Sequence, residues 1–251
     1  MLDLSLLQIL AVSAAAFLAA IIGGVSGYGT GLLLPPILLP LVGPTAVVPI
    51  ISLSALVTNA TRLFVFREVF DRVTARRVLL CALPGTAAGA YFYTLLTGPA
   101  VMAIIGFVLV ILVPLRRILM RRHGGLSAGG TLAASAGYGI INGGTSGSGV
   151  ILLTILLSTG LVGSAVIATD AGISIVLGVL KVAVFQSAGL LTSSAVVMAA
   201  IIGVSAVPGA FIAKRISTRI SARLHTGLLD AVVILGGILL VIEAIRAASS
   251  V

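Results

Sequence analysis

The sequence predicts an all-α integral membrane protein built from two repeats of opposite orientation. Hydrophobic residues make up 59% of the chain and charged residues 8%, whereas an average soluble protein is ~25% charged. The apolar runs are continuous rather than alternating, which indicates helices and not strands. A glycine-rich stretch at residues 24–30 also recurs 120 positions later, at residues 144–150.

The apolar runs give the expected helices in chain order. The first run has no basic stretch before it, so we expect a membrane helix rather than a cleaved signal peptide. We expect a single membrane domain over 1–251, with repeat A at 1–122 and repeat B at 126–251. The runs cover residues 5–22, 30–42, 44–65, 75–96 and 99–115, then 127–143, 149–160, 163–187, 192–213 and 226–245.

The second run of each half is too short to cross a membrane. Residues 30–42 number 13 and include three prolines. At ~1.5 Å per residue they reach ~20 Å, less than the ~30 Å hydrocarbon core. The matching run 149–160 is no longer. We therefore expect each half to open with a broken-helix hairpin whose tip lies within the membrane, followed by about three transmembrane helices. Two short helices with a surface loop are the alternative.

The basic residues predict the orientation of the two halves. They cluster at 67–77, 116–122 and 214–223, and such clusters normally lie in the cytoplasm. The loop after the third run is basic in the first half and uncharged in the second, and the loop after the fourth run shows the reverse. The halves therefore face opposite ways. Paired broken helices in such inverted repeats point to a transporter's binding site.

Three charged residues lie inside apolar runs: Arg62, Asp170 and Lys181. Each costs at least ~2.5 kcal/mol at the membrane centre, so a lipid-facing position is disfavoured. With the offset of 120 residues between the halves, Arg62 aligns with Val182, which is next to Lys181. Two cations thus approach one site from equivalent helices, which suits a small anion. For Arg62, snorkelling to the cytoplasmic surface is an equally good interpretation.

Asp170 is not repeated, because Ile50 stands at its equivalent position. It shares a helix face with Ser174 and Lys181, but ~16 Å of helix separates Asp170 from Lys181, so the two cannot pair directly. In a cavity Asp170 could carry a coupling proton. The alternative is that it caps or bonds to neighbouring backbone near the outer leaflet or the hairpin tip.

The glycine-rich tips add hydroxyl and backbone groups to the predicted site. A short helix presents unpaired N–H groups at its start, and two such ends facing each other would bind an oxyanion. Glycines that only permit close helix packing are the alternative. The candidate anion-binding residues of the tips are Ser26, Gly27, Tyr28, Gly29 and Thr30 in the first half, and Asn142, Thr145, Ser146, Gly147 and Ser148 in the second.

Other functional classes find little support in the sequence. No zinc-binding motif, P-loop or nucleophile elbow is present, so we expect neither an enzyme nor a cofactor or metal site. The basic residues are not interleaved with aromatic ones, so we expect no nucleic-acid partner. A membrane scaffold without its own substrate, and an anion channel, remain alternatives to a transporter. The oligomeric state, coupling ion and direction of transport stay open.

A set of motifs recurs in order along the chain and carries a family resemblance. These are the run Gly23–Gly31 with Pro35, Asn59 with Arg62, and Pro84-Gly85, then the run Gly143–Gly149, Lys181, and Pro208-Gly209. With these motifs the chain resembles the sulfite exporter TauE/SafE family, also called TSUP transporters, over nearly its whole length. The resemblance adds Asn59 to the candidate site. It implies transport of sulfite, sulfonates such as sulfoacetate, or related organosulfur acids, with export across the bacterial inner membrane expected.

Overall fold

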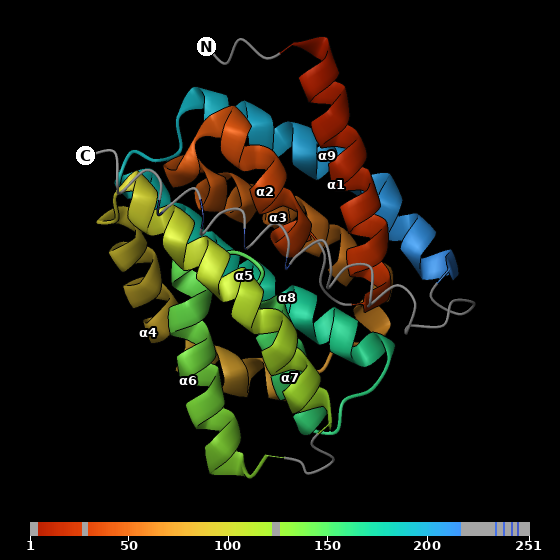
Figure 1. The fold of residues 1–251 in the computed structure, drawn as a ribbon. Coiled ribbons are helices and arrows are strands. Elements are labelled where there is room, and N and C mark those ends of the chain that lie inside the picture. The colour runs from red at the N-terminus through yellow and green to blue at the C-terminus, as the bar shows by residue number, and fades with distance from the viewer. Residues whose placement is uncertain are drawn as a thin grey trace.

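The computed structural model describes residues 5–26, 30–121 and 126–216, together with Ile234, Ile238, Ile242 and Ile245, which are helical. The predicted last helix, 226–245, otherwise lies outside the described residues. Within these ranges the chain forms helices and no strand, so the all-α prediction is confirmed (Figure 1). The helices are α1 (Leu6–Ser26), α2 (Thr30–Val42), α3 (Pro44–Phe66), α4 (Arg72–Thr94), α5 (Gly98–Arg121), α6 (Ala128–Gly144), α7 (Gly149–Ser158), α8 (Ser164–Ser187) and α9 (Ser193–Ile216), with a 3₁₀ turn η1 (Arg67–Val69).

The helix lengths agree with a multi-pass membrane protein. In the described part of the chain, α1, α3, α8 and α9 are long and apolar enough to cross a membrane. Both α2, with 13 residues, and α7, with 10, are shorter. After each short helix, a glycine with positive φ directly precedes the next long helix, Gly43 at 76° and Gly163 at 56°. These glycines are 120 positions apart and precede α3 and α8, so both halves break the chain at the same place.

Helices α3 and α8 cross at the centre of the bundle in opposite directions. A Cβ atom at Gly178 would lie 2.8 Å from the Leu56 side chain. Further along α3, Arg62 pairs with Asp170, and Phe66 packs against the first turns of α8. Residue numbers rise along α3 as they fall along α8. The two helices occupy equivalent positions in the sequence repeat, so this antiparallel crossing agrees with the inversion that the charge pattern predicts.

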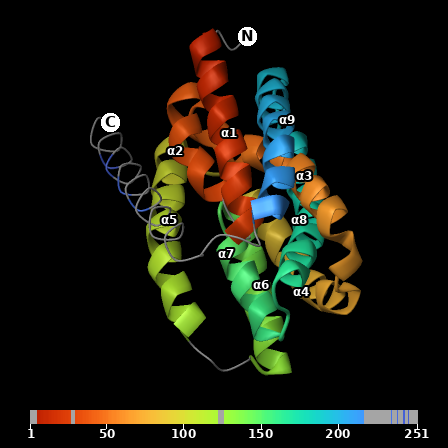
Figure 2. The same cartoon turned by 90° about the vertical axis from the view of Figure 1, so that its right-hand side faces the viewer.

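The outer helices pair across the two halves. Helix α4 packs along α6, and α1 packs along α9 (Figures 1 and 2). Exchanging the halves converts one pair into the other. In the α4–α6 pair, Gly139 faces the carbonyl of Ala82 and Gly143 faces the carbonyl of Thr86. The residue numbers of the contacting positions rise together along α4 and α6, so these helices are parallel. Small residues allow the backbones to approach this closely.

The described residues of the three basic clusters lie at one end of the bundle. The first cluster begins α4 and the second precedes α6, and the parallel packing of α4 and α6 brings their starts together. From the third cluster, the Lys214 Nζ donates a hydrogen bond to the carbonyl of Val65, 3.1 Å away, at the end of α3. Arg67 directly follows α3, and its guanidinium group lies over the ring of Phe64. This arrangement is what a shared cytoplasmic position of the clusters requires.

Candidate functional site

The two hairpin tips meet inside the protein. A Cβ atom at Gly31, in the first turn of α2, would lie only 2.8 Å from the backbone nitrogen of Gly147 in the second tip. Gly147 has a φ of 85°, a conformation that other residues rarely adopt. Thr145, Ser146 and Ser148 in the same tip are 3%, 5% and 2% exposed. The second tip is therefore part of the protein interior and not a surface loop.

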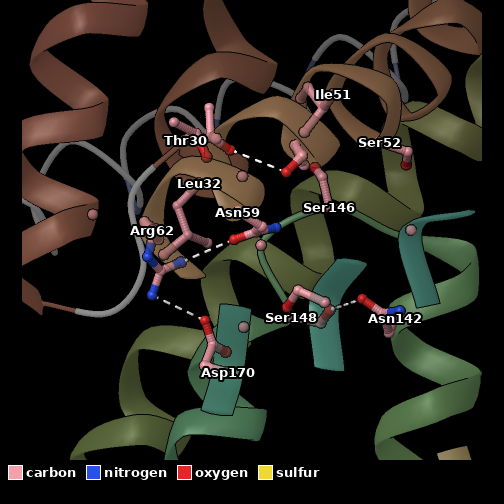
Figure 3. Close-up of a pocket in the computed structure, with 18 of the residues that line it drawn as sticks. Thr30, Leu32, Ile51, Ser52, Asn59, Arg62, Asn142, Ser146, Ser148 and Asp170 are labelled. Carbon is pink, nitrogen blue, oxygen red and sulfur yellow. Dashed lines mark hydrogen bonds and ion pairs between the residues drawn. The ribbon is translucent and has the colours of Figure 1, made fainter. Parts of the chain in front are cut away.

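A cavity of about 130 Å³ lies beside this contact, with a lining drawn from both halves (Figure 3). Every predicted site residue whose side chain is described contributes to it. Gly27, Tyr28 and Gly29 lie outside the described residues, and Ser26 is described by its backbone alone. The predicted residues that line the cavity are Thr30, Asn59, Arg62, Asn142, Thr145, Ser146, Gly147, Ser148, Asp170 and Lys181.

Arg62 and Asp170 form an ion pair between α3 and α8. The Arg62 Nη2 lies 3.0 Å from the Asp170 Oδ2, and the side chains are 12% and 3% exposed. The Arg62 Nη1 also donates a hydrogen bond to the Asn59 Oδ1, 3.1 Å away (Figure 3). Snorkelling of Arg62 to the surface is therefore wrong, because its side chain turns inward to a carboxylate. The alternative that Asp170 bonds to backbone is wrong for the same reason.

Lys181 holds the second hairpin tip. Its Nζ donates hydrogen bonds to the carbonyls of Asn142, at 2.7 Å, and Thr145, at 3.0 Å. These carbonyls lie at the end of α6, where a helix has no internal donors for them. The ammonium group satisfies them and offsets the negative end of the α6 dipole. Since an ammonium group has three N–H donors, one remains for a ligand.

The starts of α2 and α7 both face the cavity. Thr30 and Gly31 line it from α2, and Ser148 and Gly149 line it from α7. Helix N-termini carry unpaired N–H groups and a positive partial charge. Lys181 offsets the negative end of α6, whereas the starts of α2 and α7 keep their positive partial charge at the cavity. Such an environment favours an oxyanion.

Asn142 is oriented by its neighbour in the tip. The Ser148 Oγ donates a hydrogen bond to the Asn142 Oδ1, 2.9 Å away (Figure 3). Because the amide oxygen is engaged in this bond, the Nδ2 donor is left for another partner.

Sequence analysis did not assign several other polar side chains that line the cavity. Ser52 precedes Asn59 by seven residues on α3, and Tyr138 precedes Asn142 by four on α6. Both spacings put the earlier residue on the same helix face as the later one. A search for polar residues on the same helix face, running back from Asn59 and from Asn142, would have found them. Thr58 and Ser174 complete the set of polar lining residues.

No group of three or more His, Cys, Asp and Glu residues that could hold a metal ion occurs in the described ranges.

Comparison with known proteins identifies a family for the chain. A family model described as Sulfite exporter TauE/SafE matches residues 12–240. This range includes every residue that lines the cavity. No curated protein and no solved structure matches the chain.

Proposed function

The chain belongs to the sulfite exporter TauE/SafE family, and we propose that it exports small sulfur-containing anions across the bacterial inner membrane. The family consists of membrane transporters for sulfite-type anions, and the long apolar helices agree with this class. The proposed substrates are sulfite, sulfonates such as sulfoacetate and related organosulfur acids.

The observation that carries this proposal is the cavity at the contact between the two hairpin tips. It lies between equivalent helices that run in opposite directions, where inverted-repeat transporters bind their substrates. Its lining includes Arg62, Lys181 and Asp170, so the formal charge of two cations and one acid is +1. The starts of two short helices add positive partial charge. A small anion is the ligand that this combination favours.

We propose that repeats A (1–122) and B (126–251) move against each other and expose the cavity to alternate sides of the membrane. The basic end of the bundle then faces the cytoplasm. An inside-negative potential favours the exit of an anion by ~2.3 kcal/mol per charge per 100 mV. Export can therefore proceed on the membrane potential, without a coupled proton at Asp170.

Flux through purified protein in proteoliposomes tests the proposal. We expect saturable transport of labelled sulfite or sulfoacetate that is strongly reduced in Lys181→Ala. Lys214→Ala is the matched control, because it also removes a lysine that bonds to a helix carbonyl but lies outside the cavity lining. It should transport as the wild type does. Flux that never saturates would indicate a channel. No flux, with no thermal shift by sulfite or sulfonates, would indicate a scaffold.

A further inference from the structure

We infer that the cavity selects a singly charged sulfur oxyanion that carries its own hydrogen-bond donor, such as hydrogensulfite, over oxyanions that offer only acceptors. This inference rests on the proposed function and narrows its substrate class. Three features of the cavity carry it: an unpaired acceptor, two unpaired donors, and the charge of the lining.

The acceptor is one oxygen of Asp170. The Oδ2 atom pairs with Arg62, whereas the Oδ1 atom is buried and has no hydrogen-bond partner in the described part of the chain. Asp170 is buried and lines the cavity. A buried acceptor without a partner is unfavourable. A ligand with an O–H or N–H group would satisfy it, while a ligand with lone pairs alone would be repelled by it.

The donors belong to the second hairpin tip. The Asn142 Nδ2 and the Ser146 Oγ are also buried and without partners among the described residues. Lys181 adds its third N–H from the same side, since it bonds to the carbonyls of this tip. Figure 3 shows Asp170, Asn142 and Ser146 at separate positions around the pocket. A ligand between them meets donors at one end and an acceptor at the other.

The charge of the lining limits the charge of the ligand. Neither tip segment, 24–31 nor 142–149, contains a charged side chain. The lining therefore carries the +1 of Arg62, Lys181 and Asp170. A monoanion neutralises this charge. A dianion would exceed this formal charge by one, so only the partial positive charges at the starts of α2 and α7 would offset the excess, and the unpaired Asp170 oxygen would repel it.

Two probes of nearly the same shape test the inference on the wild-type protein. Sulfamate and methanesulfonate are both tetrahedral monoanions, and they differ by an NH₂ group in place of a CH₃ group. Titration calorimetry in detergent gives their dissociation constants, with sulfite as a third ligand. We expect sulfamate to bind about tenfold more tightly than methanesulfonate, as one satisfied buried acceptor would give.

The variant Asp170→Asn tests whether Asp170 causes the preference for sulfamate over methanesulfonate. Because the guanidinium of Arg62 can only donate, the amide oxygen of the new side chain should turn toward it. The NH₂ group would then replace the Oδ1 atom at the cavity. The preference for sulfamate should disappear or reverse, and a dianion such as sulfate should gain affinity. Asp71→Asn, which keeps the cap of α4, makes the same change outside the cavity and should leave the preference intact.

The outcomes separate this inference from the proposed function. Equal binding of the two probes, or tighter binding of methanesulfonate, overturns the inference and leaves the anion site standing. Binding of sulfite with no binding of either probe does the same. No binding of any of the three overturns the proposed function as well. An unchanged preference in a folded Asp170→Asn protein removes Asp170 as its source. The wild-type comparison needs no variant, so it decides the selection even where Asp170→Asn fails to fold.

Discussion

Arg62 and Lys181 occupy nearly equivalent positions in the two halves, but they bind different partners. Arg62 on α3 pairs with the carboxylate of Asp170 on α8, so its ion pair joins one half to the other. Lys181 on α8 donates to the carbonyls of Asn142 and Thr145, so its bonds stay within the second half. In the described part of the chain no carboxylate pairs with Lys181.

The two halves share the cation beside the cavity but not the acid that pairs with it. The repeat places a cation beside the cavity in each half. The acid occurs once, because Ile50 stands where the second half has Asp170. One cation is therefore neutralised and the other is not. If the halves move against each other, Lys181 travels with its own tip, whereas the Arg62–Asp170 pair must loosen or shift. The pair and the lysine should respond differently to mutation.

Removal of the acid should have the largest effect. Asp170→Leu leaves the buried guanidinium of Arg62 without its carboxylate, and breaking a buried ion pair from one side costs about 3–5 kcal/mol. The double variant Arg62→Met with Asp170→Leu replaces both charges by apolar groups and should recover much of this loss. Thermal and denaturant unfolding in detergent of the wild type, Asp170→Leu, Arg62→Met and the double variant measures the coupling. Additive losses would mean that the pair does not join the halves.

The contact between the tips should be nearly as sensitive. Gly31→Ala places a Cβ atom 2.8 Å from the backbone nitrogen of Gly147, and a backbone atom cannot move aside as a side chain can. We expect a loss of about 1–3 kcal/mol in the free energy of unfolding, together with reduced sulfite transport. Gly137→Ala is the control, because a Cβ atom at this α6 position meets open space. It should be neutral or stabilising by up to ~1 kcal/mol. If Gly31→Ala had the same free energy of unfolding as Gly137→Ala, the two tips would not be in close contact.

Much of the fold was predictable, because glycine breaks and charge clusters mark the ends of membrane helices. Helix boundaries shifted where polar residues remain helical. Helix α4 starts at Arg72 and not at 75, since Asp71 caps it by accepting from the backbone nitrogen of Thr74. Helix α5 continues to Arg121, beyond the predicted end at 115. Apolar runs locate the part of a helix inside the membrane and not the whole helix.

Most of the polar residues that line the cavity were predictable, but their bonding partners were not. Both cations could be found as charges inside apolar runs. The Arg62–Asp170 pair depends on where α3 and α8 cross, and nothing in the sequence gives that register. Helices that are apolar all round also lack the polar face that would show which side is buried. The bonds of Lys181 likewise required knowing that the end of α6 lies beside α8.

Removal of the second cation should have an intermediate effect, mainly on binding. Lys181→Ala removes the cation that pairs with no carboxylate among the described residues, and it leaves the carbonyls of Asn142 and Thr145 without this donor. A charge-assisted hydrogen bond is worth ~1.5–3 kcal/mol, so the dissociation constant for sulfite should rise ~10- to 100-fold. Lys181→Arg keeps the charge and should lose less. Calorimetric titration of the three proteins checks the order. Normal binding by Lys181→Ala would mean that the lysine serves only to hold the tip.

The smallest effect should come from a neutral hydrogen bond within the second tip. Ser148→Ala removes the hydroxyl that donates to the Asn142 Oδ1 at 2.9 Å. A bond between neutral groups contributes ~0.5–1.5 kcal/mol, so sulfite affinity should fall about two- to tenfold, as the amide of Asn142 loses its fixed orientation. Ser158→Ala is the matched control, because its hydroxyl bonds to the carbonyl of Ile155 at the far end of α7. A serine change that weakens binding as much as Lys181→Ala would show that hydroxyl and amide groups, and not the unneutralised charge, hold the anion. The contrast between the two cations would then lose its functional meaning.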